Sequence, residues 1–201
     1  MAKSRLPLKP AWNSPVVLTF ALAACLIMAA DNLAHGRFTP TFFATYPGFH
    51  WASPLFYFRL VSHVLGHKNW AHLTANFSVI LLIGPLIEEK YGSGRLLKMM
   101  LITALVTGIL NSAFFATGLL GASGLAFMMI LLSSFTNHRD GELPLTFVLV
   151  VLLFLAKEVA NAFNHDDISQ FAHIIGGICG SLFGFLRGTG RGGKGARAGG
   201  D

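Results

Sequence analysis

Two residues whose types could form a catalytic pair lie in apolar parts of the chain. Ser123 stands in Gly121-Ala122-Ser123-Gly124, and His173 follows 50 residues later. Ionisable and polar side chains are costly inside a bilayer, so those found there usually have a function. A serine hydroxyl can attack a carbonyl carbon when a neighbouring histidine accepts its proton. The two residue types therefore suggest nucleophilic chemistry within a membrane.

The tetrapeptide around Ser123 is weak support when taken alone, because short motifs also occur by chance. Leu125 stands where the Gly-x-Ser-x-Gly elbow of soluble hydrolases has its second glycine. A serine at a helix start lies beside free backbone N–H groups and the positive end of the helix dipole, which favour a developing negative charge. Gly121 allows a tight turn, and Gly124 lets another helix approach. The alternative is that Ser123 only caps the helix.

A stripe of small residues follows His173. Gly176, Gly180 and Gly184 recur at four-residue spacing on one face of the last apolar run, a pattern that lets membrane helices pack backbone to backbone. His173 lies one turn before Gly176 on that face. If the stripe packs on the Ser123 helix, the His173 imidazole could reach the Ser123 hydroxyl as a general base. The alternative is a structural histidine bonded to backbone.

A third group of polar residues surrounds the start of the second apolar run, namely His63, His67, His72 and Asn76. His72 and Asn76 are four residues apart and share a helical face. Both can donate hydrogen bonds without a negative charge, as an oxyanion site requires. A metal site is the alternative, but His-Glu-x-x-His is absent and no cysteine or carboxylate lies nearby as a further ligand. The sequence therefore favours no metal.

Composition assigns the chain to the integral membrane proteins. Hydrophobic residues make up 53% and charged residues 12%, and the mean hydropathy is +0.60, far from a soluble domain. Cys25 and Cys179 lie in apolar runs and indicate buried small hydrophobes, not a disulfide framework. The net charge of +6 comes from basic residues dispersed at the ends of apolar runs, which argues against nucleic acid as a partner.

Six predominantly apolar runs predict six membrane spans. The run after Ser123 is shorter than the roughly 20 residues that cross a bilayer, so its helix should start below the membrane surface. A loop at that depth must be packed in protein or line a wet cavity, which places Gly121 to Ser123 at the floor of a water-accessible pocket. The runs cover residues 15–30, 70–87, 96–118, 122–136, 143–163 and 169–186.

Charge placement predicts the orientation. Most Lys and Arg residues fall on the side of both termini, which are therefore expected to be cytoplasmic. The aromatic-rich segment 31–69 then faces outward and suits a structure lying partly in the interface. A signal peptide is the alternative for the first run, because Leu22-Ala23-Ala24-Cys25 resembles a lipoprotein cleavage site. We expect a cytoplasmic segment 1–14, a six-span domain 15–186 and a disordered cytoplasmic Gly/Arg-rich tail 187–201.

Together these features resemble the rhomboid intramembrane serine proteases of the minimal bacterial six-span type, over about residues 16–186. One departure is Phe58, where many members carry Trp before the arginine. The resemblance rests on Phe58-Arg59, on His63, His67, His72 and Asn76 at the family's spacing, on Glu88 with Gly92-Ser93-Gly94, on Gly121-Ala122-Ser123-Gly124, and on Ala172-His173-Ile174-Ile175-Gly176 with Gly180.

The resemblance implies an all-α polytopic fold with a membrane-lying first loop, in a bacterial inner membrane. It implies a Ser123/His173 dyad without an acidic third member, an oxyanion site from the Ser123 N–H, His72 and Asn76, and a first loop structured by Arg59. The implied partners are transmembrane protein substrates and membrane lipids, with no cofactor. Two other classes remain open: a catalytically inactive relative that binds membrane clients, and a transporter, for which only Lys157 and Glu158 supply charge within a span.

Overall fold

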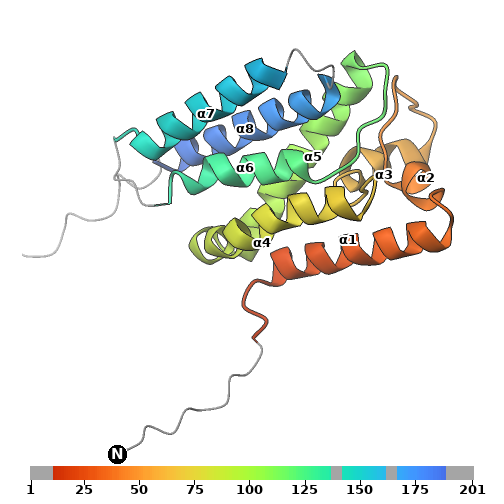
Figure 1. Cartoon of the computed structure of the whole chain (residues 1–201), viewed down its shortest axis with the longest axis horizontal. Helices are drawn as coiled ribbons and strands as arrows, with labels where there is room; N and C mark the ends of the chain where they lie inside the picture. The colour runs from red at the N-terminus through yellow and green to blue at the C-terminus, as the bar shows by residue number, and fades with distance from the viewer. Residues whose placement is uncertain (1–10, 137–141, 162–166, 189–201) are drawn as a thin grey trace, which may run out of the picture.

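The computed structural model is all-α and describes residues 11–136, 142–161 and 167–188. Its helices pack as a bundle, with the short helices α2 and α3 gathered at one end (Figure 1). Residues 1–10 of the predicted N-terminal segment 1–14 and residues 189–201 of the predicted tail 187–201 lie outside the described residues. The helices of the described part are α1 (Pro15–Leu33), α2 (Phe38–Phe42), α3 (Pro54–Ser62), α4 (Trp70–Tyr91), α5 (Ser93–Phe114), α6 (Ser123–Ser133), α7 (Leu145–Asn161) and α8 (Asp167–Gly188).

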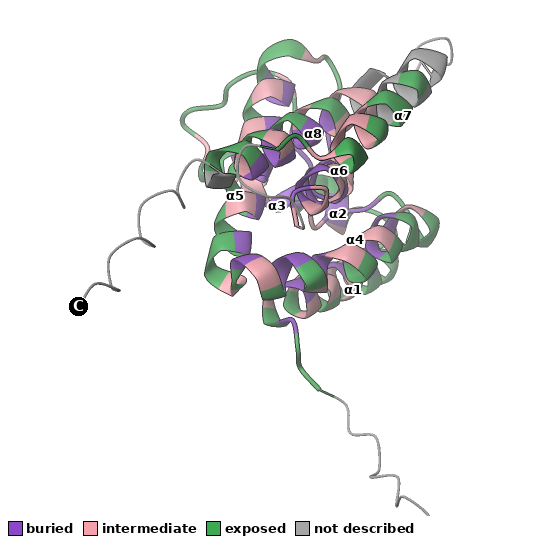
Figure 2. Cartoon of the chain, turned by 90° about the vertical axis from the view of Figure 1, so that its left-hand side faces the viewer, coloured by how far each residue is buried: buried purple, intermediate pink, exposed green. Residues whose placement is uncertain are grey.

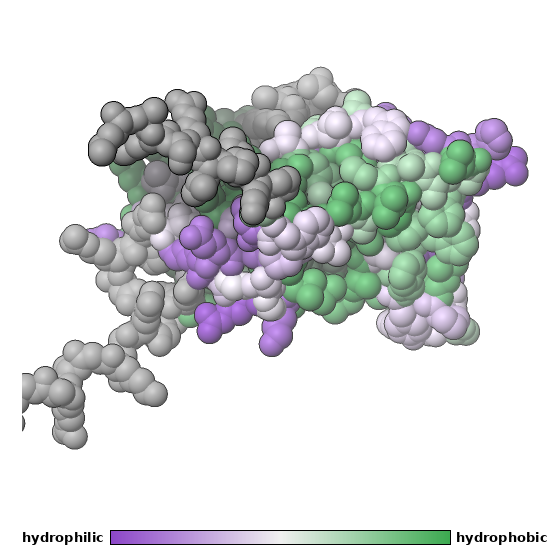
Figure 3. All heavy atoms as spheres, turned by 90° about the horizontal axis from the view of Figure 1, so that it is seen from below, coloured by the Kyte–Doolittle hydropathy of each residue, from purple (hydrophilic) through white to green (hydrophobic). Residues whose placement is uncertain are grey.

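Among the residues that the structure describes, three helices are long and apolar enough to cross a membrane: α1, α4 and α5, with mean hydropathies of 2.0, 1.6 and 1.6. Two shorter apolar helices accompany them, α6 and the part of α8 from Gln170 to Leu186. On the face seen in Figure 3, hydrophobic surface lies between hydrophilic groups toward either end. The chain is therefore an integral membrane protein with apolar helices.

Helix α6 is short, as the sequence predicts. Its 11 residues rise only about 16 Å, against roughly 30 Å of hydrocarbon. It lies between α4 and α8 (Figure 1), and seven of its residues are buried, including Leu125, Met128 and Met129. Figure 2 shows the buried positions facing the interior of the bundle, with exposed positions on the outer sides of α1 and α4. A helix buried on most sides can hold its first residues at a defined depth.

The helix before it ends earlier than the apolar run suggests. The run 96–118 is continuous in sequence, but α5 ends at Phe114 and Phe115 has an extended backbone. The Asn111 side chain explains the end, because its Nδ2 donates to Thr117 O (3.2 Å) and to Thr45 Oγ1 (2.9 Å). An amide that binds backbone beyond its own helix favours a turn there. Hydropathy alone cannot predict these two hydrogen bonds, and so it does not predict where α5 ends.

The loop between α1 and α4 docks on the connection between α5 and α6. Thr45 N donates to Leu119 O (3.0 Å), and Leu119 N donates to Thr45 Oγ1 (3.2 Å). A Cβ at Gly118 would lie 2.6 Å from Thr45 O, so the two backbones approach as closely as glycine allows. This first loop therefore supports the chain that leads into α6.

Arg59 of α3 ties this first loop together. Its Nε donates to Thr41 O (3.0 Å), an Nη group donates to the same oxygen, and the guanidinium lies 5.0 Å from the centre of the Tyr46 ring. Ser62 Oγ adds a bond to Phe42 O (3.3 Å). These contacts join α3 to the segment after α2, and they fit a structuring role for Arg59.

Glu88 fastens the opposite end of the bundle. Its carboxylate accepts hydrogen bonds from the first backbone N–H groups of α1, at Val16 (3.0 Å) and Val17 (3.1 Å), and from Ser93 Oγ of α5 (2.7 Å). The side chain is 3% exposed. A negative charge at a helix N-terminus satisfies unpaired donors and interacts favourably with the helix dipole. One residue of α4 thus joins three helices.

Replacing Glu88 with alanine is expected to lower the free energy of unfolding by about 2 to 4 kcal/mol, because buried N–H groups lose a charged acceptor. The matched control is Glu89→Ala, since Glu89 is exposed on the next position of the same helix. Its effect should stay within about 0.5 kcal/mol. Denaturant titration in detergent measures both. Equal stability losses in the two variants would contradict the capping role.

Candidate active site

Ser123 is the first residue of α6, and the N-cap position belongs to Ala122. The backbone bond that opens the helix runs from Ala126 N to Ala122 O (2.9 Å). Ser123 is half-buried. The cap interpretation of Ser123 is therefore wrong in this structure. Its hydroxyl stands instead at the N-terminal turn, where backbone N–H groups and the helix dipole favour negative charge.

The glycine stripe of α8 packs on α6, as its spacing predicts. A Cβ built on Gly176 would lie 2.0 Å from Gly124 O, and one on Gly180 would lie 2.2 Å from Met128 O. Real Cβ atoms do not approach oxygen so closely, so only glycine fits either position. Gly124 also faces α8, because its own Cβ would lie 3.2 Å from Ala172 O. The two helices meet backbone to backbone beside Ser123.

This packing brings His173 to the Ser123 face of α6. The His173 ring stacks on Phe127, with ring centroids 4.2 Å apart and planes inclined by 29°. Ser123 and Phe127 are four residues apart on one helix and therefore share a face. The neighbouring residue Ala172 touches Gly124, immediately after Ser123. Phe127 thus holds the imidazole plane next to the first turn of α6.

His72 and Asn76 lie against the glycine that precedes Ser123 by two positions. Gly121 has φ of +120°, and a Cβ on it would lie 2.7 Å from His72 Cε1, 2.9 Å from His72 Nε2 and 3.7 Å from Asn76 Nδ2. The positive φ and the close imidazole both require glycine. Gly121 therefore brings the α4 side chains up to the backbone that leads into Ser123.

Asn76 carries an unsatisfied donor at this place. The residue is 7% exposed, and its Nδ2 is buried without a hydrogen-bond partner among the described residues. A buried amide left unpaired costs about 1 to 3 kcal/mol. Such costs are typical of groups kept ready for a ligand or a transition state. The orphaned Nδ2 faces the Gly121 turn, where an oxyanion formed at Ser123 would need donors.

His63 and His67 hold the backbone of this turn. Gly121 N donates to His63 O (3.0 Å), and Ala122 N donates to His67 Nε2 (3.4 Å). His67 Nδ1 donates to Leu65 O (3.2 Å), which leaves Nε2 as the acceptor. His63 Nε2 donates to Ala104 O (3.0 Å). Both rings therefore act in their neutral form as parts of the scaffold around Ser123.

Burial keeps these two rings neutral. It lowers the pKa of His63 to about 4, against the opposing hydrogen bond to Ala104 O. The pKa of His67 is also lowered to about 4, chiefly by burial and in part by the positive form of His72, while the hydrogen bond to Leu65 O opposes the shift. Protonation of His67 Nε2 would remove the acceptor for Ala122 N. The turn before Ser123 is therefore sensitive to acid.

Stability should fall as the pH drops from about 6.5 to about 4. In that interval the unfolded histidines bind protons and the folded ones do not, so lower pH favours unfolding. The folded pKa values of about 4 against 6.5 correspond to roughly 3 kcal/mol per histidine at most. Melting temperature against pH measures the effect. His67→Gln should flatten the curve of melting temperature against pH, and His35→Gln, at an exposed position, should leave it unchanged. Identical curves for the wild type and both variants would contradict the role given to His67.

Within the described residues, no group of three or more His, Cys, Asp or Glu side chains is placed to hold a metal ion. Both ring nitrogens of His67 are engaged with the backbone, and His63 Nε2 is engaged with Ala104 O. Three of the four ring nitrogens of His63 and His67 therefore already have hydrogen-bond partners.

Sequence reasoning missed two contributors to the site. Phe127 stacks on His173, and its four-residue spacing from Ser123 was the available signal. Lys90, at the end of α4, donates from Nζ to Phe135 O (2.9 Å) and to Thr136 O, just past the end of α6. A cation there satisfies terminal carbonyls and suits the negative end of the helix. No local pattern relates residues 45 positions apart.

Comparison with known families agrees with this geometry. The rhomboid domain family matches residues 55–189, which is more than half of the chain and includes all the site residues described above. The chain therefore belongs to the rhomboid family.

Curated relatives are rhomboid proteases. The chain is 27% identical over 131 residues to Rhomboid protease GlpG of Haemophilus influenzae, an alignment that spans 64% of this chain and 68% of the relative. It is 31% identical over 177 residues to Rhomboid-like protease 1 of Toxoplasma gondii, spanning 80% of this chain and 55% of the relative. It is 29% identical over 133 residues to Rhomboid protease GlpG of Pectobacterium atrosepticum, an alignment that spans 63% of this chain and 47% of the relative. The chain thus spans about half to two thirds of the length of these relatives.

Proposed function

We propose that the protein is an intramembrane serine endopeptidase that cleaves single-span membrane proteins within or near the outer end of their transmembrane segment. Ser123 is the nucleophile and His173 is the general base. The observation that carries this proposal is the stacking of His173 on Phe127, one turn after Ser123, at a helix contact that only glycine permits. Such a contact supports a fixed geometry between base and nucleophile.

The proposed reaction proceeds through an acyl-enzyme. Ser123 Oγ attacks the scissile carbonyl carbon while His173 takes its proton, and the carbonyl oxygen becomes an oxyanion. The Ser123 backbone N–H, His72 and Asn76 donate to that oxygen, and one such donor is worth about 3 kcal/mol. The C–N bond then breaks, and the leaving amine takes the proton from His173. Water, deprotonated by His173, attacks the ester carbonyl and releases the acid product and Ser123.

The membrane arrangement that suits this reaction has six spans within residues 15–186 and both termini in the cytoplasm of a bacterial cell. Ser123 then lies below the outer surface, since α6 is too short to reach across. A substrate helix must expose its scissile carbonyl, so residues that weaken helices are expected near the cleaved bond. Gly121, Gly124, Gly176 and Gly180 are proposed as supporting residues that allow the close approach.

Proteolysis by the purified chain is the direct test of this function. The protein should be reconstituted in liposomes with a fluorescent single-span reporter, and the products should be identified by mass spectrometry. We expect two fragments separated at a bond near one membrane surface. A reporter that binds yet stays intact over many hours, with several reporter sequences tested, would favour an inactive client-binding protein.

Loss of an oxyanion donor should separate activity from stability. Asn76→Ala is expected to lower kcat by about tenfold to a hundredfold with little change in KM, because the donor acts mainly in the transition state. Its thermal stability should not decrease, since the Nδ2 removed has no partner among the described residues. His72→Ala should also cause a partial loss. Wild-type cleavage rates in the double variant would refute the role of both residues.

A further inference from the structure

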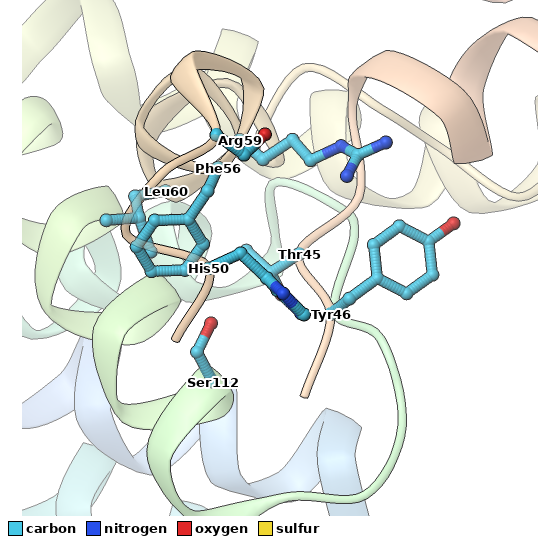
Figure 4. A pocket seen from close by; sticks show the side chains of 8 residues that line it. Thr45, Tyr46, His50, Phe56, Arg59, Leu60 and Ser112 are labelled. Carbon is cyan, nitrogen blue, oxygen red and sulfur yellow. The ribbon is translucent and has the colours of Figure 1, made fainter. Parts of the chain in front are cut away.

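A cavity of about 300 Å³ lies in the first loop, apart from the candidate active site. Figure 4 shows the side chains that line it, from the loop and from α3, with Ser112 of α5 below. Its walls combine apolar surface from Phe56 and Leu60 with polar groups from Tyr46, Arg59 and Ser112. The cavity is therefore lined by a cation and hydroxyl groups on an apolar support.

Ser112 contributes a hydroxyl that nothing in the described protein satisfies. The residue is 3% exposed, and its Oγ is buried without a hydrogen-bond partner among the described residues. In Figure 4 this oxygen points into the cavity between His50 and Phe56. The backbone carbonyl of Ser112 is already used by Gly48 N (2.8 Å). A buried hydroxyl of this kind indicates a polar occupant of the cavity.

Arg59 contributes a cation that no carboxylate of the described residues neutralises. Its contacts with described residues are the Thr41 carbonyl oxygen and the Tyr46 ring, and no described carboxylate pairs with it. The guanidinium has further N–H groups to donate. Charged side chains of membrane proteins pair with opposite charges or with backbone carbonyls, and the free N–H groups of a guanidinium suit phosphate particularly well.

The aromatic residues around the cavity indicate its depth in the membrane. Trp51 is 65% exposed, Tyr57 50% and Phe58 48%, and all three belong to the same first loop as the cavity. Exposed aromatic rings of membrane proteins concentrate at the level of the lipid headgroups. Phospholipid phosphates are the most abundant anions at that level.

We propose that this cavity binds a phosphate group, supplied by the headgroup of a membrane phospholipid. Arg59 donates to the phosphate oxygens at the rim, and Ser112 Oγ donates from the base. The phosphate neutralises the guanidinium and joins α3, the first loop and α5. The proposal does not rest on proteolysis, because the cavity lining includes neither Ser123 nor His173. A Ser123→Ala protein is expected to bind the lipid as the wild type does.

Native mass spectrometry of the full chain in detergent tests the proposal. The protein is titrated with phosphatidylglycerol, with a diacylglycerol of the same acyl chains but no phosphate, and with inorganic phosphate. We expect one tightly bound phosphatidylglycerol and no comparable binding of diacylglycerol. Displacement of the lipid by millimolar inorganic phosphate would indicate a site for the phosphate group alone. Failure to displace it would indicate recognition of the whole headgroup, and both outcomes support the site.

Variants distinguish this site from general lipid adhesion. Arg59→Met should weaken phosphatidylglycerol binding by about tenfold or more, and Ser112→Ala by about threefold to tenfold, since each removes a donor to a charged group. Ser112→Ala keeps the loop contacts of Arg59 and so remains informative if Arg59→Met does not fold. Arg37→Met, at an exposed cation of the same loop, and Ser78→Ala, at an exposed position of α4, should change binding less than twofold. Equal binding of diacylglycerol, or unchanged binding in both Arg59→Met and Ser112→Ala, would overturn the proposal.

Discussion

Replacing Ser123 with alanine is expected to abolish cleavage of a single-span reporter, with a rate loss of at least about 10⁴-fold. The change removes one oxygen from a half-buried residue that does not cap its helix. The melting temperature should therefore stay within a few degrees of the wild type. His173→Ala should show the same loss of rate, and the double variant should be no worse than either single variant, because the pair acts as one unit.

A second serine of the same helix provides the matched control. Ser133 stands at the other end of α6, where its Oγ donates to Ile130 O (2.7 Å). Ser133→Ala makes the same chemical change far from His173 and should keep nearly full activity. Reporter cleavage followed by gel electrophoresis compares the wild type, Ser123→Ala and Ser133→Ala. Substantial cleavage by Ser123→Ala would remove the basis of the proposed chemistry.

Adding one methyl group at Gly176 should have the next largest effect. The new Cβ would lie 2.0 Å from Gly124 O, so α8 must move away from α6 or the helices must distort. Overpacking of this kind costs about 1 to 3 kcal/mol. A displacement of His173 by about 1 Å from Ser123 can lower the rate by about a hundredfold. Gly176→Ala is therefore expected to lose both stability and activity.

The adjacent glycine is the control for this prediction. A Cβ on Gly177 would lie 3.8 Å from Leu131 side-chain atoms, which is ordinary contact. Gly177→Ala should keep full activity, and its stability should be equal or higher by up to about 1 kcal/mol, because alanine favours helix more than glycine does. Cleavage rates and melting temperatures of the two variants are compared in the same detergent. Similar behaviour of both variants would mean that the close α6 and α8 contact does not position the site.

Patterns along single helices were sufficient to predict much of this site. The four-residue glycine spacing predicted a helix face that packs closely, and the structure shows that its partner is α6. The shortness of the apolar run after Ser123 predicted a helix too short to span. The spacing of His72 and Asn76 predicted a shared face, which meets Gly121 in the structure. Each of these inferences depends on the helical period alone, which sequence reports well.

Contacts between distant segments could not be predicted in the same way. Glu88 caps α1 from a position 72 residues away from Val16, and Lys90 reaches the carbonyl groups at the end of α6 from 45 residues away. The end of α5 depends on the Asn111 side chain, which hydropathy does not describe. Two groups of statements stay predictions. One is the set of catalytic roles given to Ser123, His173, His72 and Asn76, and the other is the number of membrane spans.

The most direct measurement is covalent labelling of the intact protein with a fluorophosphonate, followed by mass spectrometry of its peptides. Only a serine activated by a neighbouring base reacts readily with this reagent. We predict one adduct, on Ser123, that disappears in Ser123→Ala and falls strongly in His173→Ala while Ser133→Ala labels as the wild type does. A folded wild-type protein that gains no adduct on Ser123, or labelling that is unchanged without His173, would contradict the proposed dyad.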